Sequence, residues 1–482
     1  MGLAMNFNYL LTEDDRYKYY ILQYLELNKK NYLSVESVCE FAGLSKFKVK
    51  KYLGELNNDL QTLQITNAVQ LLDNNEVAVH SLTTMIVKKA RLAYLQKSGI
   101  YLLLQNALTD GLGVEALAKQ NFLSKSYVYL LKKQLSKILK EYHIEYRNNA
   151  LRGSELAIRN LLYTIYYDFY NGLGQPFSEA IETQIEQLKQ QIMRYYPLKL
   201  SLIKTIKLNL FLGVLIQRLK KDCAIDATTF TTIDEQNDAF SISQIINGRK
   251  DEIVDIQERD WLLTFLYAEN MTTCYLGRSV VQQVKPIEDG TKAICATIMT
   301  ELALPITVEK NLYHQLLTTN LRFALFYVEA STFTSKRQIR FFEESYPTGS
   351  AVVSNHLEAF MAEAMINPRL QVSLFYSYLF AIIESVPYQM LNPSIYVCVD
   401  FSNGEAYTHY IEKQIMGFKN LNIVLEENVT QRTQLYVSDF AQEILKIDQI
   451  IWKNPPSTDD WGDFGDLIVK IKKELVLDET IH

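Results

Sequence analysis

Along most of the chain, apolar residues recur with a helical period, so the sequence predicts a mainly α-helical protein. Between residues 8 and 30, Tyr, Leu and Ile stand three and four positions apart, as they do on one face of a helix. One helix is expected over 84–108, with a stop at Asp110-Gly111. Apolar and aromatic stripes across 154–390, broken by Pro and Gly (at Pro286 to Gly290, for example), are typical of helix bundles.

The pattern changes after Pro393. Residues 395–399 form a continuous apolar, β-rich run, as expected for a strand that is buried on both faces. Further strands are expected at 421–425 and 435–437, and helices from Gly404 to about Gly417 and from about Phe464. Strand, glycine loop, helix and strand in this order predict a small α/β domain with a parallel sheet.

A short pattern occurs twice, 79 positions apart. Residues 44–49 (LSKFKV) return as residues 123–128 (LSKSYV), each where a helix-turn-helix would begin its second helix. The Ser is expected to cap that helix, and the Val to return to the core one turn later. A small residue six positions before the Ser, Cys39 or Ala118, lets the two helices cross closely.

The flanking segments complete two modules. The first helix-turn-helix is predicted over about 34–60, with Ser34 as a cap and a short hairpin or wing at 69–80. The second is predicted at 114–120 and 125–140. Strand, Asn-Asn turn and strand follow at 143–153, which indicates a winged helix.

Charge strengthens this interpretation. The chain has a net charge of −6, but residues 81–152 hold 12 basic and four acidic residues, a surplus of eight, so the remainder sums to −14. A basic segment on an acidic protein is typical of local phosphate binding. Lysine-rich helices are also common on solvated surfaces, but together with the repeat this segment favours DNA.

The expected DNA contacts lie on the second helix of each module. In the second module, Val128, Leu131, Leu135 and Ile138 form the predicted inward stripe. The candidate DNA-binding residues are Lys46, Lys48, Lys50 and Lys51 in the first module, and Ser124, Lys125, Ser126, Tyr127, Tyr129, Lys132, Lys133 and Arg147 in the second. Glu55 and Asp59 weaken the positive field of the first module, so we expect it to position the protein more than to read bases.

The sequence does not favour a membrane protein, an exported protein or an enzyme. No apolar run approaches the ~20 residues of a membrane span, no export signal is evident, and five scattered cysteines fit reduced thiols in a cytoplasmic protein. The six dispersed histidines and the lack of nucleotide or hydrolase motifs predict neither an enzyme nor a cofactor or metal site. The loop 402–404 could bind an anion at a helix N-terminus, although a tight turn is favoured.

Taken in order, these features resemble the Mga/AtxA-type transcription regulators, close to the MafR-like members. The resemblance rests on the paired turns, the exit at 151–155 with Ile158 and Arg159, the stretch 312–316 with Arg322, and the terminal strand-loop-helix-strand. It implies helix-turn-helix domains at 5–83 and 84–154, sugar-phosphotransferase regulation domains at 155–278 and 279–390, and a domain like a sugar-transporter IIB subunit at 393–482.

The resemblance also implies a function. It predicts a cytoplasmic regulator of the global or virulence-activator type that binds double-stranded DNA as a homodimer or higher oligomer. It also predicts tuning by phosphocarrier proteins. A regulation domain of this kind usually offers a phosphorylatable histidine: residues 155–278 contain none, whereas the second contains His314 and His356.

A second departure and two rivals accompany this interpretation. In IIB subunits a Cys after the first strand accepts the phosphate; here Phe401 takes that place and Cys398 falls within the strand, so we expect a domain used for association. One rival is a phosphotransferase-regulated RNA-binding antiterminator, which would begin with a β-rich domain instead of two helix-turn-helices. The other is a phosphotransferase carrier.

Overall fold

The computed structural model describes residues 7–30, 33–66, 68–72, 74–109, 111–225, 230–231, 240–248, 250–272, 280–281, 284–326, 342–343, 345–367, 370–418 and 421–479. The chain divides into two compact units. The first holds residues 1–282 and 325–329, and the second holds 283–324 and 330–482. The mainly helical fold with a small parallel α/β domain at the C-terminal end agrees with the prediction.

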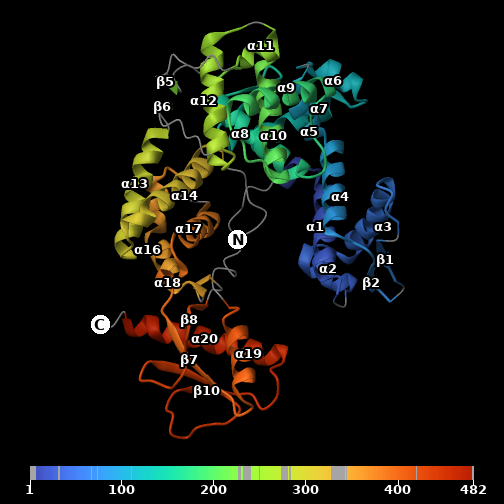
Figure 1. The fold of residues 1–482 in the computed structure, drawn as a ribbon. Coiled ribbons are helices and arrows are strands. Elements are labelled where there is room, and N and C mark those ends of the chain that lie inside the picture. The colour runs from blue at the N-terminus through green and yellow to red at the C-terminus, as the bar shows by residue number, and fades with distance from the viewer. Residues whose placement is uncertain are drawn as a thin grey trace. The chain divides into compact units, whose positions relative to one another are not determined.

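The first unit begins with the first helix-turn-helix module (Figure 1). Its elements are η1 (Phe7–Leu10), α1 (Glu13–Asn28), α2 (Val35–Ala42), α3 (Lys46–Thr62), β1 (Val69–Leu71) and β2 (Val77–Val79). Ser34 caps α2 through a capping box with Ser37, and β1 pairs antiparallel with β2, as predicted.

The second module follows. Its elements are α4 (Thr84–Lys97), α5 (Gly99–Leu108), α6 (Val114–Gln120), α7 (Lys125–Lys140), β3 (Glu145–Arg147) and β4 (Ala150–Arg152). The helix-turn-helix and the wing lie where the sequence pattern predicts them.

The single helix predicted over 84–108 is wrong, because the chain breaks at Ser98. The buried Ser98 hydroxyl caps α5 by accepting from the amide of Ile100, and it donates to the carbonyl of Leu10. The predicted stop at Asp110 lies outside the described residues, whereas Gly111 adopts positive φ.

A helical bundle completes the first unit. It contains α8 (Glu155–Tyr170), α9 (Glu179–Tyr195), α10 (Leu202–Leu219), α11 (Ile242–Asn247) and α12 (Glu252–Ala268), with β5 (Phe230–Thr231) paired to β6 (Val280–Val281). Arg159 donates to Glu155 and Glu258, and Arg218 donates to Glu155. All four charges are buried or nearly so, and they tie α8, α10 and α12 together in a balanced cluster.

The second unit begins with another helical bundle, made of α13 (Val284–Glu301), α14 (Ile306–Leu325), α16 (Pro347–Glu363), α17 (Gln371–Ser385) and α18 (Tyr388–Leu391). The predicted break from Pro286 to Gly290 is wrong, since α13 runs through it. Pro286 lies in the first turn, where a missing N–H costs nothing. At Gly290 a Cβ would come within 2.1 Å of the Glu363 carbonyl oxygen, so glycine permits the close approach of α16.

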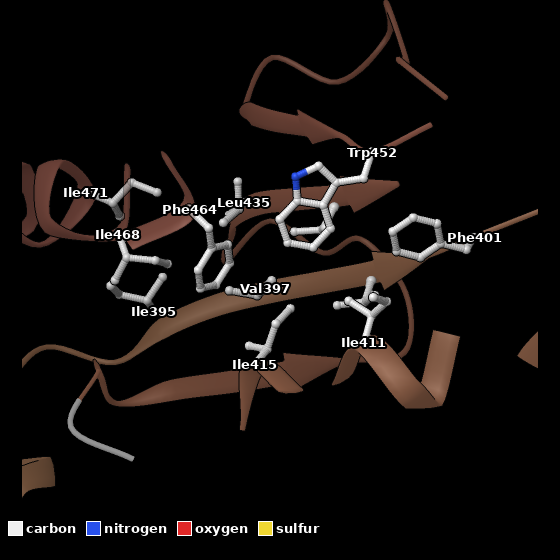
Figure 2. Close-up of a cluster of buried hydrophobic side chains, with 12 residues drawn as sticks. Ile395, Val397, Phe401, Ile411, Ile415, Leu435, Trp452, Phe464, Ile468 and Ile471 are labelled. Atoms are coloured by element: carbon white, nitrogen blue, oxygen red, sulfur yellow. The ribbon is translucent and has the colours of Figure 1, made fainter. Parts of the chain in front are cut away.

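The second unit ends in the α/β domain. Its elements are β7 (Ile395–Asp400), α19 (Glu405–Ile415), β8 (Ile423–Glu426), β9 (Thr433–Ser438), β10 (Asp448–Ile451) and α20 (Thr458–Glu479). The four strands are parallel in the order β10-β9-β7-β8. Figure 2 shows the core, in which Val397 and Leu435 lie near Ile415 and Phe464.

Two details of this domain differ from the sequence prediction. The edge strand β10 is only partly buried and does not appear among the predicted strands, because it begins with Asp448 and Gln449 and only its second half is apolar. The last helix begins at Thr458 and not near Phe464. Ser457 and Asp460 explain the earlier start: the Asp460 amide donates to the Ser457 hydroxyl, and the Ser457 amide donates to the Asp460 carboxylate. Within the described ranges, no helix combines the length and apolar character needed to cross a membrane.

Candidate nucleic-acid interface

The two copies of the repeat fold in the same way. The Ser45 hydroxyl accepts from the amide of Lys48, and the Ser124 hydroxyl accepts from the amide of Tyr127. The Val one turn later, Val49 or Val128, is fully buried. The predicted caps and the predicted buried Val of both second helices are therefore confirmed.

The turns also match, at a position where the residue types differ. Gly43 and Phe122, each two residues before the capping Ser, both adopt left-handed backbone, with φ of 64° and 55°. Glycine is suited to this conformation, whereas a bulky residue there is an outlier. Phe122 is 97% exposed, so no packing contact of its ring offsets the strain.

An ion pair repeats as well. Lys46 lies 2.6 Å from Glu36, and Lys125 pairs with Glu115, again 79 positions further on. In each module the pair joins the first residue of the second helix to the first turn of the helix before it. The ion pair was not predicted, although a Glu lies nine positions before the capping Ser in both copies of the repeat. Both lysines must exchange a carboxylate for phosphate if they are to contact DNA.

The outward line of α7 is defined by residues directly opposite its buried stripe. That stripe is Val128, Leu131, Leu135 and Leu139; Leu139 takes the place predicted for Ile138, which is only partly buried. At 100° per residue, the opposite side carries Ser126, Leu130, Lys133 and Lys137, all exposed. Among the described residues, no ion pair involves Lys133 or Lys137, so their charge is available to an anion.

Lys132 lies elsewhere. Its Nζ donates to the Asn149 side chain at 3.0 Å and stands 5.4 Å from the centroid of the Tyr146 ring. Both partners belong to the wing, with Asn149 in its turn and Tyr146 in β3. Lys132 therefore connects the helix to the wing. Arg147, in the same wing, is exposed, as are Tyr127 and Tyr129 on α7.

The second helix of the first module has a different electrostatic setting. Lys51 Nζ lies 3.6 Å from both Asp14 and Glu55, so its charge is locally balanced. Lys48 and Lys50 are exposed. Acidic residues of α1 and α3 also enclose the buried Lys18, whose Nζ lies 2.8 Å from Asp15 and 2.6 Å from Asp59. The field around α3 is therefore weaker than around α7.

The second module is joined to the adjacent bundle through α8. The Arg91 guanidinium on α4 donates to the Asp168 carboxylate at 2.5 Å and lies over the Phe169 ring. The hydroxyls of Tyr101 and Tyr170 lie 3.0 Å apart. These buried and half-buried contacts hold the module and the end of α8 together.

The predicted regulatory histidines lie in the second unit. His314 on α14 is partly buried, and burial lowers its pKa, which favours the neutral imidazole. His356 on α16 lies 3.5 Å from Glu301 and stacks on Phe360. No described group of His, Cys, Asp and Glu side chains is arranged to hold a metal ion.

The loop after β7 is closed by internal contacts. Phe401 is buried in the domain core (Figure 2), and burial raises the pKa of the Cys398 thiol to about 11. The Ser402 amide donates to the Asp439 carboxylate at 3.0 Å, and the Ser402 hydroxyl donates to it as well. These bonds lower the pKa of Asp439, so a carboxylate already occupies the anion position that the sequence suggested.

The capped second helix, the left-handed turn, the wing and the exposed lysines described above define the second module as a helix-turn-helix of the DNA-binding class. Residues 83–170 match the family described as the Mga helix-turn-helix domain. The match begins beside α4 and ends at Tyr170, the last residue of α8, so it covers the second module together with the helix that anchors it. No curated protein matches the chain.

Proposed function

We propose that this protein is a transcription regulator, not an enzyme, which binds double-stranded DNA mainly through its second helix-turn-helix module. The observation that carries the proposal is the family match over 83–170, on a module whose outward line presents Lys133 and Lys137. In this proposal the other contacts of the second module are Ser124, Lys125, Ser126, Tyr127, Tyr129 and Arg147, whereas Lys132 supports the wing. Lys46, Lys48, Lys50 and Lys51 of the first module position the protein on phosphates.

Binding to duplex DNA and to hairpin RNA, compared over a range of salt concentrations, tests this function. We expect the full chain to bind duplex DNA with an affinity that falls steeply with salt, because each phosphate contact releases counterions. Hairpin RNA should bind more weakly at every salt concentration, because its deep, narrow major groove does not admit a helix. Preference for the hairpin would contradict the proposal and favour the antiterminator.

Regulation is proposed to act through the second bundle, with His314 as the first candidate for phosphorylation and His356 as the second. The lowered pKa of His314 supports this, since the neutral imidazole is the nucleophilic form. His314→Asp, which places a negative charge there, should change promoter output or oligomeric state relative to His314→Ala. Identical behaviour of both variants and the parent would leave His314 as a structural residue. Acid-labile labelling from phosphorylated phosphocarrier protein is the direct test.

The C-terminal domain is proposed to be IIB-like in fold and to serve dimerisation instead of phosphate transfer. Exposed Phe440 and Ile444 in the β9–β10 loop, together with two open sheet edges, support an association surface. Removal of everything after Asn392 should shift the protein towards monomer in sedimentation and weaken binding to long DNA, because two linked sites become one. A truncated protein that stays dimeric would place the interface in the bundles. We also propose that the protein activates transcription from its target promoters.

A further inference from the structure

Leu130 is an unusual residue for its position. It is 49% exposed and lies at the centre of the outward line of α7, where a solvent-facing helix normally carries charge. Ser126 lies one turn before it, and Lys133 and Lys137 lie one and two turns after it. About half of this apolar side chain therefore faces solvent, on an outward line whose other members are Ser and Lys.

The first module shows the same arrangement in another register. Phe47, at the position equivalent to Ser126, is 80% exposed on the outward side of α3. Each second helix therefore combines an exposed apolar side chain on its outward side, Leu130 or Phe47, with lysines. Contact with phosphates explains the lysines. It does not explain the apolar residue, because phosphates and sugars offer it little apolar surface.

The major groove offers a matching apolar group. Thymine alone among the four bases presents a methyl group there, and apolar side chains recognise it by contact. We propose that Leu130 contacts the 5-methyl groups of thymines in the major groove and thereby determines sequence preference in the second module. The inference rests on the proposed DNA binding and adds a specificity-determining residue to it. Lys133 and Lys137, on the same line, would hold the helix at the groove.

The probe is duplex DNA with and without thymine methyl groups. Duplexes of about 30 base pairs, roughly three helical turns, are selected from a random pool by the full-length parent and resynthesised with deoxyuridine in place of thymidine. For the parent, affinity should fall about fourfold for each contacted methyl group that is lost. For Leu130→Ala the ratio of the affinities for the thymidine and deoxyuridine duplexes should approach one. Leu130→Met should retain most of the parent's preference for the thymidine duplex.

Two matched variants separate this inference from the proposed function. Ile203→Ala removes a similarly exposed aliphatic side chain from the bundle and should keep the parent ratio. Lys133→Ala should weaken binding to both duplexes equally and flatten the salt dependence, again with the ratio unchanged. The outcomes are then distinguishable. A parent that does not discriminate, or a Leu130→Ala variant that still does, would overturn the role of Leu130; a parent that binds no duplex would overturn the DNA-binding function as well.

Discussion

The two helix-turn-helix modules share their backbone devices and differ in their surroundings. Both use a Ser cap, a left-handed turn residue, a buried Val and an ion pair at the same spacing. Around α3, however, Asp14 and Glu55 balance Lys51, whereas the outward lysines of α7 have no described acidic partner. Local sequence thus fixes the shape of such a module, and its neighbours decide how much charge it can offer to DNA.

The largest expected effect separates the modules by charge. Lys133→Ala with Lys137→Ala should weaken DNA binding roughly 30-fold at 0.15 M salt, because two phosphate contacts and their counterions are lost. Lys48→Ala with Lys50→Ala, the matched change in the first module, should have a smaller effect. Anisotropy titrations at several salt concentrations measure both. Equal losses in the two double variants would mean that the modules contribute equally.

The next effect separates the modules by packing. At Gly99 a Cβ would come within 2.6 Å of the Leu131 side chain, whereas at Gly54 on α3 nothing lies within 4 Å. Gly99→Ala should therefore destabilise the second module by about 1–3 kcal/mol through overpacking. Gly54→Ala should stabilise the first by up to about 1 kcal/mol, as a helix former replaces glycine. Amide hydrogen exchange resolves the modules separately. Stabilisation by both variants would show that Leu131 moves aside freely.

Reciprocal substitutions at the left-handed turn position, Phe122→Gly and Gly43→Phe, test the contribution of this residue in each module. Phe122→Gly should stabilise the second module by about 1 kcal/mol, because glycine adopts left-handed backbone without strain. Gly43→Phe should destabilise the first by a similar amount, and open space around Gly43 leaves backbone strain as the cause. Exchange protection of the amides of Val49 and Val128 gives both values. A loss of stability in Phe122→Gly would instead mean that the Phe122 ring makes a stabilising contact in solution.

The smallest effect concerns the repeated ion pair. Glu115→Gln should free Lys125 and tighten DNA binding by less than about threefold, and Glu36→Gln should do the same for Lys46 to a lesser extent. Folding stability should change little, since both pairs are exposed. Anisotropy titrations of both variants with DNA measure the change in affinity. Weaker binding in Glu115→Gln would show that the pair orients Lys125 for DNA.

Much of the fold could be read from local signals. The caps at Ser34, Ser45 and Ser124 and the Asn148-Asn149 turn act on neighbouring backbone atoms, so sequence alone identified them. The break at Ser98 was missed because apolar periodicity continues across it, and only the Leu10 carbonyl and the close approach of Leu131 give Ser98 and Gly99 their roles. The edge strand β10 was missed because it is partly exposed, and its polar first half leaves an apolar run too short to indicate a strand.

The candidate site divides in the same way. The sequence by itself determined the duplicated helix-turn-helix, its basic charge and the set of candidate DNA-binding residues, because these depend on spacing, capping and composition. Only the tertiary structure decided which lysines are available. The wing holds Lys132, Glu115 pairs with Lys125, and Asp14 from another helix balances Lys51. Charges interact through space with residues far away in sequence, so their partners follow from the fold and not from the local pattern.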